Sequence, residues 1–140
     1  MTTLTIGALS TQTGVKIPTI RYYESIGLLP SPSRTGSNRR SFDEAAARRL
    51  RFIRHARELG FETEAIRQLL TLADDPAQPC HEADALARAH LADIDFKIAR
   101  LQALQAEVRQ MVEHCAQGQV RTCHVIEVLA DHSHCLSDRH

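Results

Sequence analysis

A heptad repeat of apolar residues, framed by cysteines, constrains this chain more than any other feature. From Ala87 to Cys115 its seam positions follow in alternating steps of four and three residues, with one polar interruption at Gln105. This spacing is typical of a coiled coil. A single amphipathic helix cannot cover such a seam, and too little sequence remains to pack along it. We therefore predict a dimerisation helix over residues 81–115 that pairs with a second copy of the chain.

Cysteine residues lie at both ends of this predicted helix. Cys80 precedes it, and Cys115 and Cys123 bracket a loop at its far end. At about 1.5 Å per residue, Cys80 and Cys115 of one chain are roughly 50 Å apart and cannot meet. In an antiparallel pair, each Cys80 lies near the other chain's Cys115 and Cys123. The spacing therefore predicts a homodimer with two metal sites, each built from both chains.

The donor set indicates which metal ions to expect. Thiolates favour soft and borderline ions. Three thiolates suit cadmium, lead or mercury, whereas zinc normally takes a fourth ligand such as histidine. The C-terminal residues also form a donor cluster that can hold a second ion. The candidate additional ligands are His81, His114, His124, His132, His134 and Cys135.

The first 30 residues predict two short helices joined by a turn. Thr5 is a suitable N-cap for the first helix, and Gly14 is expected to end it. Pro18 favours the first turn of the second helix, which we expect to run to Gly27. Two helices joined in this way are typical of a helix-turn-helix, whose second helix enters the major groove of DNA. The side chains expected to contact DNA here are Lys16, Thr19, Arg21 and Tyr22.

A basic segment follows, and its flanks can pair as a hairpin. Guanidinium groups bind phosphate oxygens through two parallel hydrogen bonds. An arginine-rich loop directly after a helix-turn-helix therefore fits a DNA-contacting wing better than an ordinary solvated loop. The expected contacts of this wing are Arg34, Asn38, Arg39 and Arg40.

Two further helices are expected before the hinge. Asp43 is the expected cap of a cationic helix over residues 43–59, in which Arg54 is the predicted phosphate contact. Thr63 is the expected cap of the next helix. The fold class is thus all-α dominated. Its predicted parts are a winged helix-turn-helix DNA-binding domain (1–74), a hinge (75–80), the dimerisation helix (81–115) and a metal-binding loop with a short helix and His/Cys tail (116–140).

The charge distribution also separates a basic front half of the chain from an acidic back half. Residues 1–60 carry ten Lys and Arg against four Asp and Glu, whereas residues 61–140 carry seven against thirteen. Only the front half therefore suits a polyanion such as DNA. There is no apolar run of about 18 residues and no signal segment, so we expect a cytoplasmic protein that does not enter the membrane. Cysteines in such a compartment favour metal or redox chemistry over structural disulfides.

Several motifs together resemble one family. They are Ile6-Gly7, Thr13-Gly14-Val15, the string Thr19-Ile20-Arg21-Tyr22-Tyr23-Glu24, Gly27-Leu28-Leu29, the wing residues with Phe42, Phe52-Ile53 and Leu59-Gly60-Phe61. The pattern resembles the MerR family of transcription regulators, in its metal-responsive branch, over nearly the whole chain. The resemblance implies a winged helix, an antiparallel coiled-coil dimer and binding to an inverted repeat within an over-long promoter spacer. It also implies that effector binding distorts and untwists the spacer for RNA polymerase, a switch that acts on uncontacted base pairs.

The resemblance also bears on the metal. Cys80 matches the cysteine that marks regulators of divalent ions, where copper, silver and gold regulators have serine. The loop from Cys115 to Cys123 has instead the length found in copper regulators, and Ala116 stands where zinc regulators have a second cysteine. The histidines near the C-terminus favour zinc, with cadmium, lead, cobalt and mercury as alternatives. The expected function is activation of a metal efflux or resistance gene.

Two other functions on the same scaffold stay open, a copper(I)-type sensor and a thiol redox sensor. The redox sensor would form a disulfide between Cys115 and Cys123 and would respond to oxidant without metal. An enzyme with a Cys/His nucleophile has little support, because no orienting third group and no oxyanion-forming glycine motif are evident.

Overall fold

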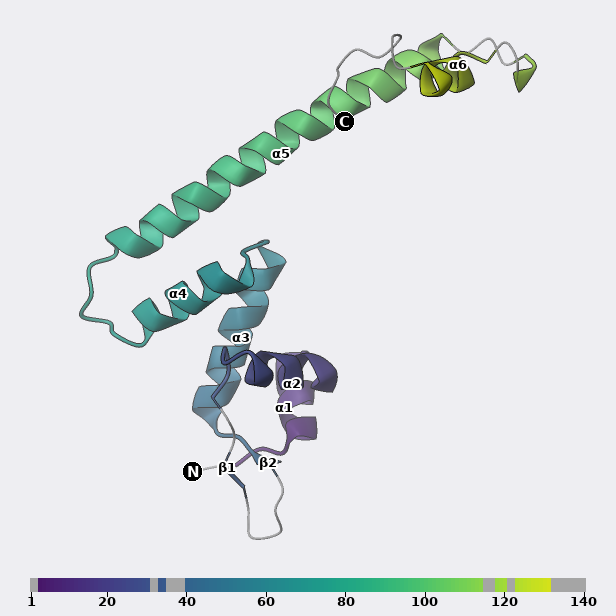
Figure 1. The fold of residues 1–140 in the computed structure, drawn as a ribbon. Coiled ribbons are helices and arrows are strands. Elements are labelled where there is room, and N and C mark those ends of the chain that lie inside the picture. Colours follow the sequence, from purple (N-terminus) through teal and green to yellow (C-terminus); the bar gives the residue numbers. More distant parts are fainter. Residues whose placement is uncertain (1–2, 31–32, 35–39, 115–117, 121–122, 132–140) are drawn as a thin grey trace. The chain divides into compact units, whose positions relative to one another are not determined.

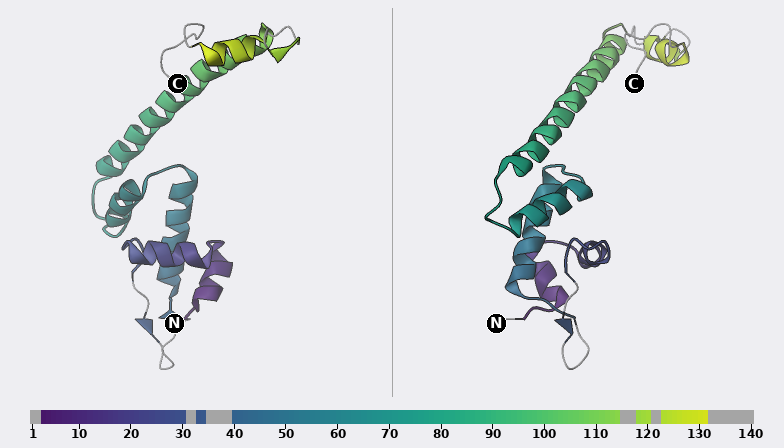
Figure 2. Two further views of the ribbon diagram at one scale, coloured as in Figure 1. Left: turned by 45° about the vertical axis from the view of Figure 1, so that its right-hand side comes forward. Right: turned by 60° about the vertical axis from the view of Figure 1, so that its left-hand side comes forward.

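The computed structural model describes residues 3–30, 33–34, 40–114, 118–120 and 123–131. The chain divides into two compact units, residues 1–86 and residues 87–140, each with its own packing. Figure 1 shows the helices and the short hairpin along the chain, and Figure 2 gives two further views. No described helix is long and apolar enough to span a membrane.

The first unit begins with the predicted pair of short helices. Helix α1 spans Ile6–Thr13, and the Thr5 hydroxyl accepts a hydrogen bond from the Ala8 amide at 3.1 Å. Gly14 ends α1 in the left-handed conformation (φ 76°), which only glycine adopts without strain. Helix α2 spans Ile17–Ser25 with proline in its first turn. The predicted cap at Thr5 and stop at Gly14 are therefore both confirmed.

The wing is a two-stranded hairpin. Strand β1 (Ser33–Arg34) pairs antiparallel with β2 (Arg40–Ser41), and Arg34 is the register partner of Arg40. Directly beyond β2, Leu4 and Phe42 exchange two backbone hydrogen bonds of 2.6 and 2.8 Å. This bridge ties the base of the wing to the segment before α1, so the predicted hairpin is confirmed at its flanks.

Helices α3 (Glu44–Glu58) and α4 (Thr63–Ala73) follow the wing. The Asp43 carboxylate accepts a hydrogen bond from the Ala46 amide at 2.9 Å, which confirms the predicted cap. The prediction that Thr63 caps α4 is wrong, because Glu62 occupies the N-cap position and makes no side-chain cap there. The apolar spacing of α4 also predicts Ala73 on its buried face together with Ile66 and Leu70, but Ala73 is exposed at the last position of the helix.

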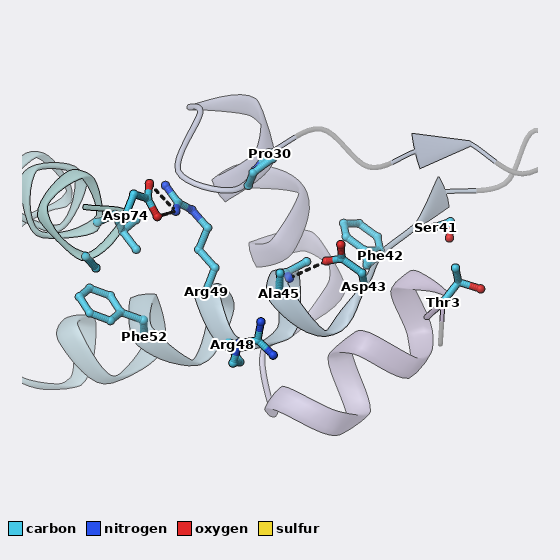
Figure 3. Close-up of a pocket in the computed structure, with 13 residues that line it drawn as sticks. Thr3, Pro30, Ser41, Phe42, Asp43, Ala45, Arg48, Arg49, Phe52 and Asp74 are labelled. Carbon is cyan, nitrogen blue, oxygen red and sulfur yellow. Dashed lines mark hydrogen bonds and ion pairs between the residues drawn. The ribbon is translucent and has the colours of Figure 1, made fainter. Parts of the chain in front are cut away.

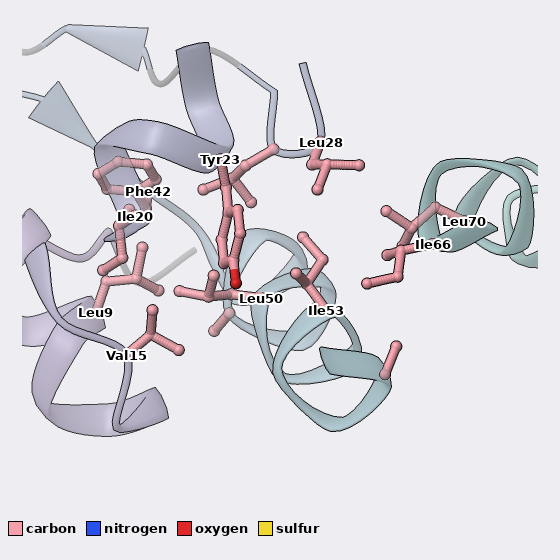
Figure 4. Packing of buried hydrophobic residues seen from close by; sticks show 13 residues of the cluster. Leu9, Val15, Ile20, Tyr23, Leu28, Phe42, Leu50, Ile53, Ile66 and Leu70 are labelled. Carbon is pink, nitrogen blue, oxygen red and sulfur yellow. The ribbon is translucent and has the colours of Figure 1, made fainter. Parts of the chain in front are cut away.

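The core of this unit joins all four helices and the wing base. Figure 4 shows Tyr23 of α2 among Leu28, Leu50 and Ile53, with the side chains of α4 facing α3. The buried side chains of α3 are Ala47, Leu50, Ile53 and Ala56, which share one face of the helix. The fully buried large side chains are Leu9, Ile20, Leu28, Leu29, Leu50, Ile53 and Ile66. This core fixes α2 against α3.

A turn from Asp75 to Gln78 leads into helix α5 (His81–Glu113), an unbroken helix of 33 residues. The backbone carbonyl of Cys80 accepts from the Asp84 amide at 3.0 Å, so Cys80 stands at the start of α5. The predicted long helix is confirmed. Its predicted seam is exposed in the single chain, and its large exposed members are Leu91, Ile94, Ile98, Leu101, Val108 and Val112.

The second unit ends in helix α6 (His124–Ala130), which lies near the C-terminal end of α5 (Figures 1 and 2). Val128 of α6 and Glu107 of α5 are the buried side chains among the described residues of this unit. So small a core leaves the apolar seam of α5 uncovered in the single chain.

Candidate DNA-contacting face and metal-binding residues

The outer face of α2 carries the predicted DNA-contacting side chains. Ile20 and Tyr23 point into the core, so residues half a turn away face outward. Arg21 is exposed, and 55% of Tyr22 is exposed although its ring lies beside that of Tyr23 (centroids 6.0 Å apart). Lys16, at the N-cap position, is exposed, and Thr19 is half-buried. The four predicted residues thus surround the N-terminal half of one well-anchored helix.

Arginines from α3 and α4 hold the backbone on both sides of α2. Arg54 donates to the carbonyl of Thr13, just before α2, at 2.5 Å. Arg67 donates to the carbonyl of Ile26, just after α2, at 2.7 Å. Because hydrogen bonds from charged donors are the stronger ones, these contacts fix where α2 sits relative to α3 and α4.

A third arginine extends this arrangement to the end of α4. Arg49 donates to the Leu28 carbonyl at 2.9 Å and pairs with the Asp74 carboxylate at 3.0 Å. Its side chain is largely buried, whereas Asp74 is exposed. The backbone after α2 is thereby connected to the residue that closes α4.

The guanidinium of Arg54 therefore has its partners within the same chain. Besides the Thr13 carbonyl, it pairs with Glu58 at 3.0 Å, and its guanidinium lies against Gly14, where a β-carbon would collide with it. The sequence suggested a phosphate contact for Arg54, but the structure gives its donors a backbone carbonyl and a carboxylate. Its role toward DNA stays a prediction.

Only two of the four predicted wing contacts lie within the described residues. Arg34 and Arg40 are in the paired strands, and Asn38 and Arg39 lie outside the described residues. The hairpin that presents them follows α2 closely in the chain, as a wing requires. Their contacts with DNA stay predictions.

A pocket of about 760 Å³ lies between the wing base, α3 and the end of α4. Figure 3 shows the Arg49–Asp74 pair on one side of it and Phe52, Arg48 and Pro30 around it. None of the described residues that line it is a cysteine or histidine, so they offer no soft-metal ligand.

The predicted metal ligands belong to different parts of the chain. Cys80 is an exposed thiol before α5, and Cys123 is a half-buried thiol at the N-cap position of α6. His81 is exposed in the first turn of α5, next to Cys80. Outside the described residues lie Cys115, His132, His134 and Cys135.

Two histidines do come together at the far end of α5. The ring centroids of His114 and His124 are 5.3 Å apart, with the rings tilted by 48°. The Nδ1 atom of His114 lies 2.8 Å from the carbonyl oxygen of Gln110, which can only accept, so Nδ1 carries the proton and donates. In the neutral ring, Nε2 then has the lone pair that a metal ion needs. Within the described ranges no three Cys, His, Asp or Glu side chains converge on one point.

The donors present fit a soft or borderline metal. Cys80 and His81 stand at the start of α5, and His114, Cys123 and His124 follow its other end. The arginines that sequence reasoning missed are Arg49 and Arg67. Their carbonyl partners lie 21 and 41 residues away in the chain, so no local pattern points to them.

Comparison with known proteins places the chain. A family model described as "MerR HTH family regulatory protein" matches residues 4–72, and one described as "MerR, DNA binding" matches residues 47–111. Heavy metal-dependent transcription regulator 2 of Rhizobium meliloti (strain 1021) is 36% identical over 130 residues, covering 93% of this chain and 88% of the relative. The mercuric resistance operon regulatory protein of Serratia marcescens is 37% identical over 128 residues, covering 90% and 87%.

A solved structure agrees with these matches over both units. The transcription regulator PbrR691 from Ralstonia metallidurans CH34, in complex with lead(II), is 38% identical and has a TM-score of 0.81. The match covers 90% of this chain and 98% of that one. On these grounds the chain belongs to the MerR family of helix-turn-helix regulatory proteins, and it is a transcription regulator rather than an enzyme.

Proposed function

We propose that this protein is a metal-sensing regulator that binds promoter DNA as a homodimer and activates a metal efflux or resistance gene. The effector is a soft or borderline divalent ion, with zinc favoured and cadmium, lead, cobalt and mercury as alternatives. One observation carries the proposal above all: in a helix-turn-helix regulator, thiols stand at the two ends of an unbroken 33-residue helix.

The exposed face of α2 supports the DNA half of the proposal. Arg21 and Tyr22 point away from the core on a helix whose two ends are held by arginines. A rigid helix with free polar side chains suits the reading of base edges in a major groove. The arginines of the wing add contacts to phosphate, which position the domain without reading sequence.

The uncovered seam of α5 supports the dimer. Six large apolar side chains repeat along one face and are exposed in the single chain. Their spacing is that of a coiled coil, so the partner that fits the whole seam is the same helix from a second copy. Two-fold pairing of this kind also matches an inverted repeat in DNA.

The length of α5 supports a site shared between the chains. At about 1.5 Å per residue, 33 residues of helix measure roughly 50 Å, so the thiols at its two ends do not reach one ion within a chain. In an antiparallel dimer, Cys115 and Cys123 of one chain face the partner's Cys80. A bound ion supplies a fixed link between the two chains at this point.

The spacing of the two DNA-binding domains explains how a bound ion would change the promoter. A link between the start of one α5 and the end of the other restrains how the two DNA-binding domains are spaced. Domains held at a new spacing on two half-sites bend or untwist the base pairs between them. This restrained dimer presents the spacer to RNA polymerase in a usable form.

The choice of metal rests on ligand chemistry. Relatives at 37% and 38% identity bear names that specify mercury and lead(II), so similarity alone does not select an ion. The family resemblance makes Cys80 a mark of divalent-ion regulators rather than of copper(I) regulators. Histidines at the far end of α5 favour zinc, which accepts mixed nitrogen and sulfur ligands.

In vitro transcription tests the proposal. The promoter is built around an operator selected by the protein from random DNA, and wild type is compared with Cys80→Ser under zinc, cadmium, lead, cobalt, mercury and copper(I). We expect activation by a divalent ion that Cys80→Ser loses, and an unchanged response in the control Ala77→Ser, which alters the same turn. Activation by copper(I) alone would favour the copper-type alternative, and activation by oxidant without metal would favour the redox sensor.

A further inference from the structure

The histidine pair at the far end of α5 has a ring spacing that fits two ligands on one ion. With zinc–nitrogen bonds of about 2.0–2.1 Å and tetrahedral angles, two imidazoles on one zinc ion have centroids about 5 Å apart. The rings of His114 and His124 have centroids 5.3 Å apart and are tilted by 48° rather than stacked face to face. Their spacing therefore already matches that of a bound pair.

The hydrogen bond of His114 prepares it for this role. Its Nδ1–H donates to the backbone carbonyl of Gln110 at 2.8 Å. Metal-ligating histidines almost always donate their other ring N–H in this manner, which fixes the tautomer and the ring orientation. Nε2 of His114 is thus the ligand atom, on an exposed side chain that an ion can reach.

The two histidines are sequence neighbours of the two loop cysteines. His114 directly precedes Cys115, and His124 directly follows Cys123, so each imidazole is one residue from a loop thiol. The carbonyl of Val120 accepts from the Cys123 amide at 3.1 Å, which turns the chain into α6 and brings His124 back toward the end of α5. By contrast, His81 belongs to the opposite end of that helix.

We propose that His114 and His124 both ligate the metal ion at the loop and give the sensor a mixed nitrogen and sulfur shell that selects zinc or cobalt. This inference rests on the proposed function. A tetrahedral ion then holds the two imidazoles, one loop thiolate and the thiolate of the partner's Cys80. Such a shell suits borderline ions, whereas copper(I) prefers thiolates alone.

X-ray absorption spectroscopy on the zinc-loaded wild-type dimer tests the ligand shell directly. We expect an average of about two sulfur and two nitrogen ligands, with the multiple-scattering features of imidazole. A shell of sulfur alone would overturn the inference while leaving the metal-sensor proposal intact. No bound zinc, cadmium, lead, cobalt or mercury would instead overturn the proposed function itself.

Variants supply the second measurement. The double variant His114→Gln/His124→Gln should lower zinc affinity by at least about 100-fold in chelator competition, since even outer-shell changes cost about 10–100-fold. Its copper(I) affinity and its affinity for DNA without metal should stay within about threefold, which shows that the loop and fold are intact. His55→Gln, an exposed histidine of α3, is the matched control. Zinc affinity unchanged in the double variant would contradict the inference.

Discussion

At the scale of single residues, the surroundings of each arginine decide what its guanidinium does. Arg54 lies on the cationic helix α3, yet its donors meet the Thr13 carbonyl and Glu58. Arg21 carries the same group on the outer face of α2, where it is exposed. A count of basic residues cannot separate these roles, because the Thr13 carbonyl that engages Arg54 lies 41 residues away in the chain. These contacts lead us to propose that Arg54 positions α2.

Arg54→Ala tests that description. We expect a loss of about 1–2 kcal/mol in the free energy of unfolding, from one charged hydrogen bond on a side chain that is 46% exposed. Operator affinity should fall while its dependence on salt concentration stays the same, because no phosphate contact is lost. Arg39→Ala, the matched variant in the wing, should instead reduce the salt slope by about 0.9. A comparable reduction in Arg54→Ala would assign it to phosphate after all.

Gly14 is a second residue whose surroundings fix its identity. Its φ of 76° is unfavourable for other residues, and an added β-carbon would displace the Arg54 guanidinium. We expect Gly14→Ala to destabilise the protein by about 1–3 kcal/mol in denaturant unfolding.

Gly7→Ala is the control for this substitution. Gly7 lies within α1, and the nearest atom to its added β-carbon is Oγ1 of Thr5 at 3.9 Å. Alanine in a helix is favoured over glycine, so we expect a gain of about 0.5–1 kcal/mol. Equal effects of the two substitutions would argue against the strained turn at Gly14.

At the scale of elements, local signals predicted most of the fold. Thr5, Gly14 and Asp43 act on amides and dihedral angles within a few residues of themselves, and each has its predicted role. Thr63 failed as a cap because Glu62 already has the extended conformation of an N-cap residue, one position earlier. The hydrophobic periodicity predicted α5 for the same reason that it predicted the helices before it: every third or fourth residue falls on one face.

A charge introduced on the seam of α5 tests the pairing of helices. Leu101 is 65% exposed in the single chain and lies at a seam position. Leu101→Glu removes a large apolar side chain from each copy, so dimerisation should lose about 3 kcal/mol or more, at least about 100-fold in Kd. Ala89→Glu, on the outer face of the same helix, should leave the dimer intact. Sedimentation equilibrium measures both, and a dimeric Leu101→Glu would refute the seam.

At the scale of the whole molecule, the proposed metal site is incomplete in one chain. The sequence predicts that the site takes ligands from two chains, because the length of α5 keeps Cys80 and Cys123 of one chain apart. The pairing of His114 with His124 was beyond sequence reasoning, since it depends on how the chain turns between α5 and α6. Which thiolates join these imidazoles depends on the second chain, and no property of one sequence fixes that.

Mixed dimers measure the shared site most directly. One chain carries Cys80→Ser and the other carries Cys115→Ser with Cys123→Ser, and the mixed dimer is purified through two different tags. In an antiparallel dimer with shared sites, neither homodimer has a complete site, yet the mixed dimer keeps one. We therefore predict one tightly bound zinc ion per mixed dimer and none in either variant homodimer. A mixed dimer without tightly bound zinc would contradict the account, because a parallel pair leaves no complete site in it. Tightly bound zinc in the Cys80→Ser homodimer would contradict it equally, because all ligands would then come from one chain.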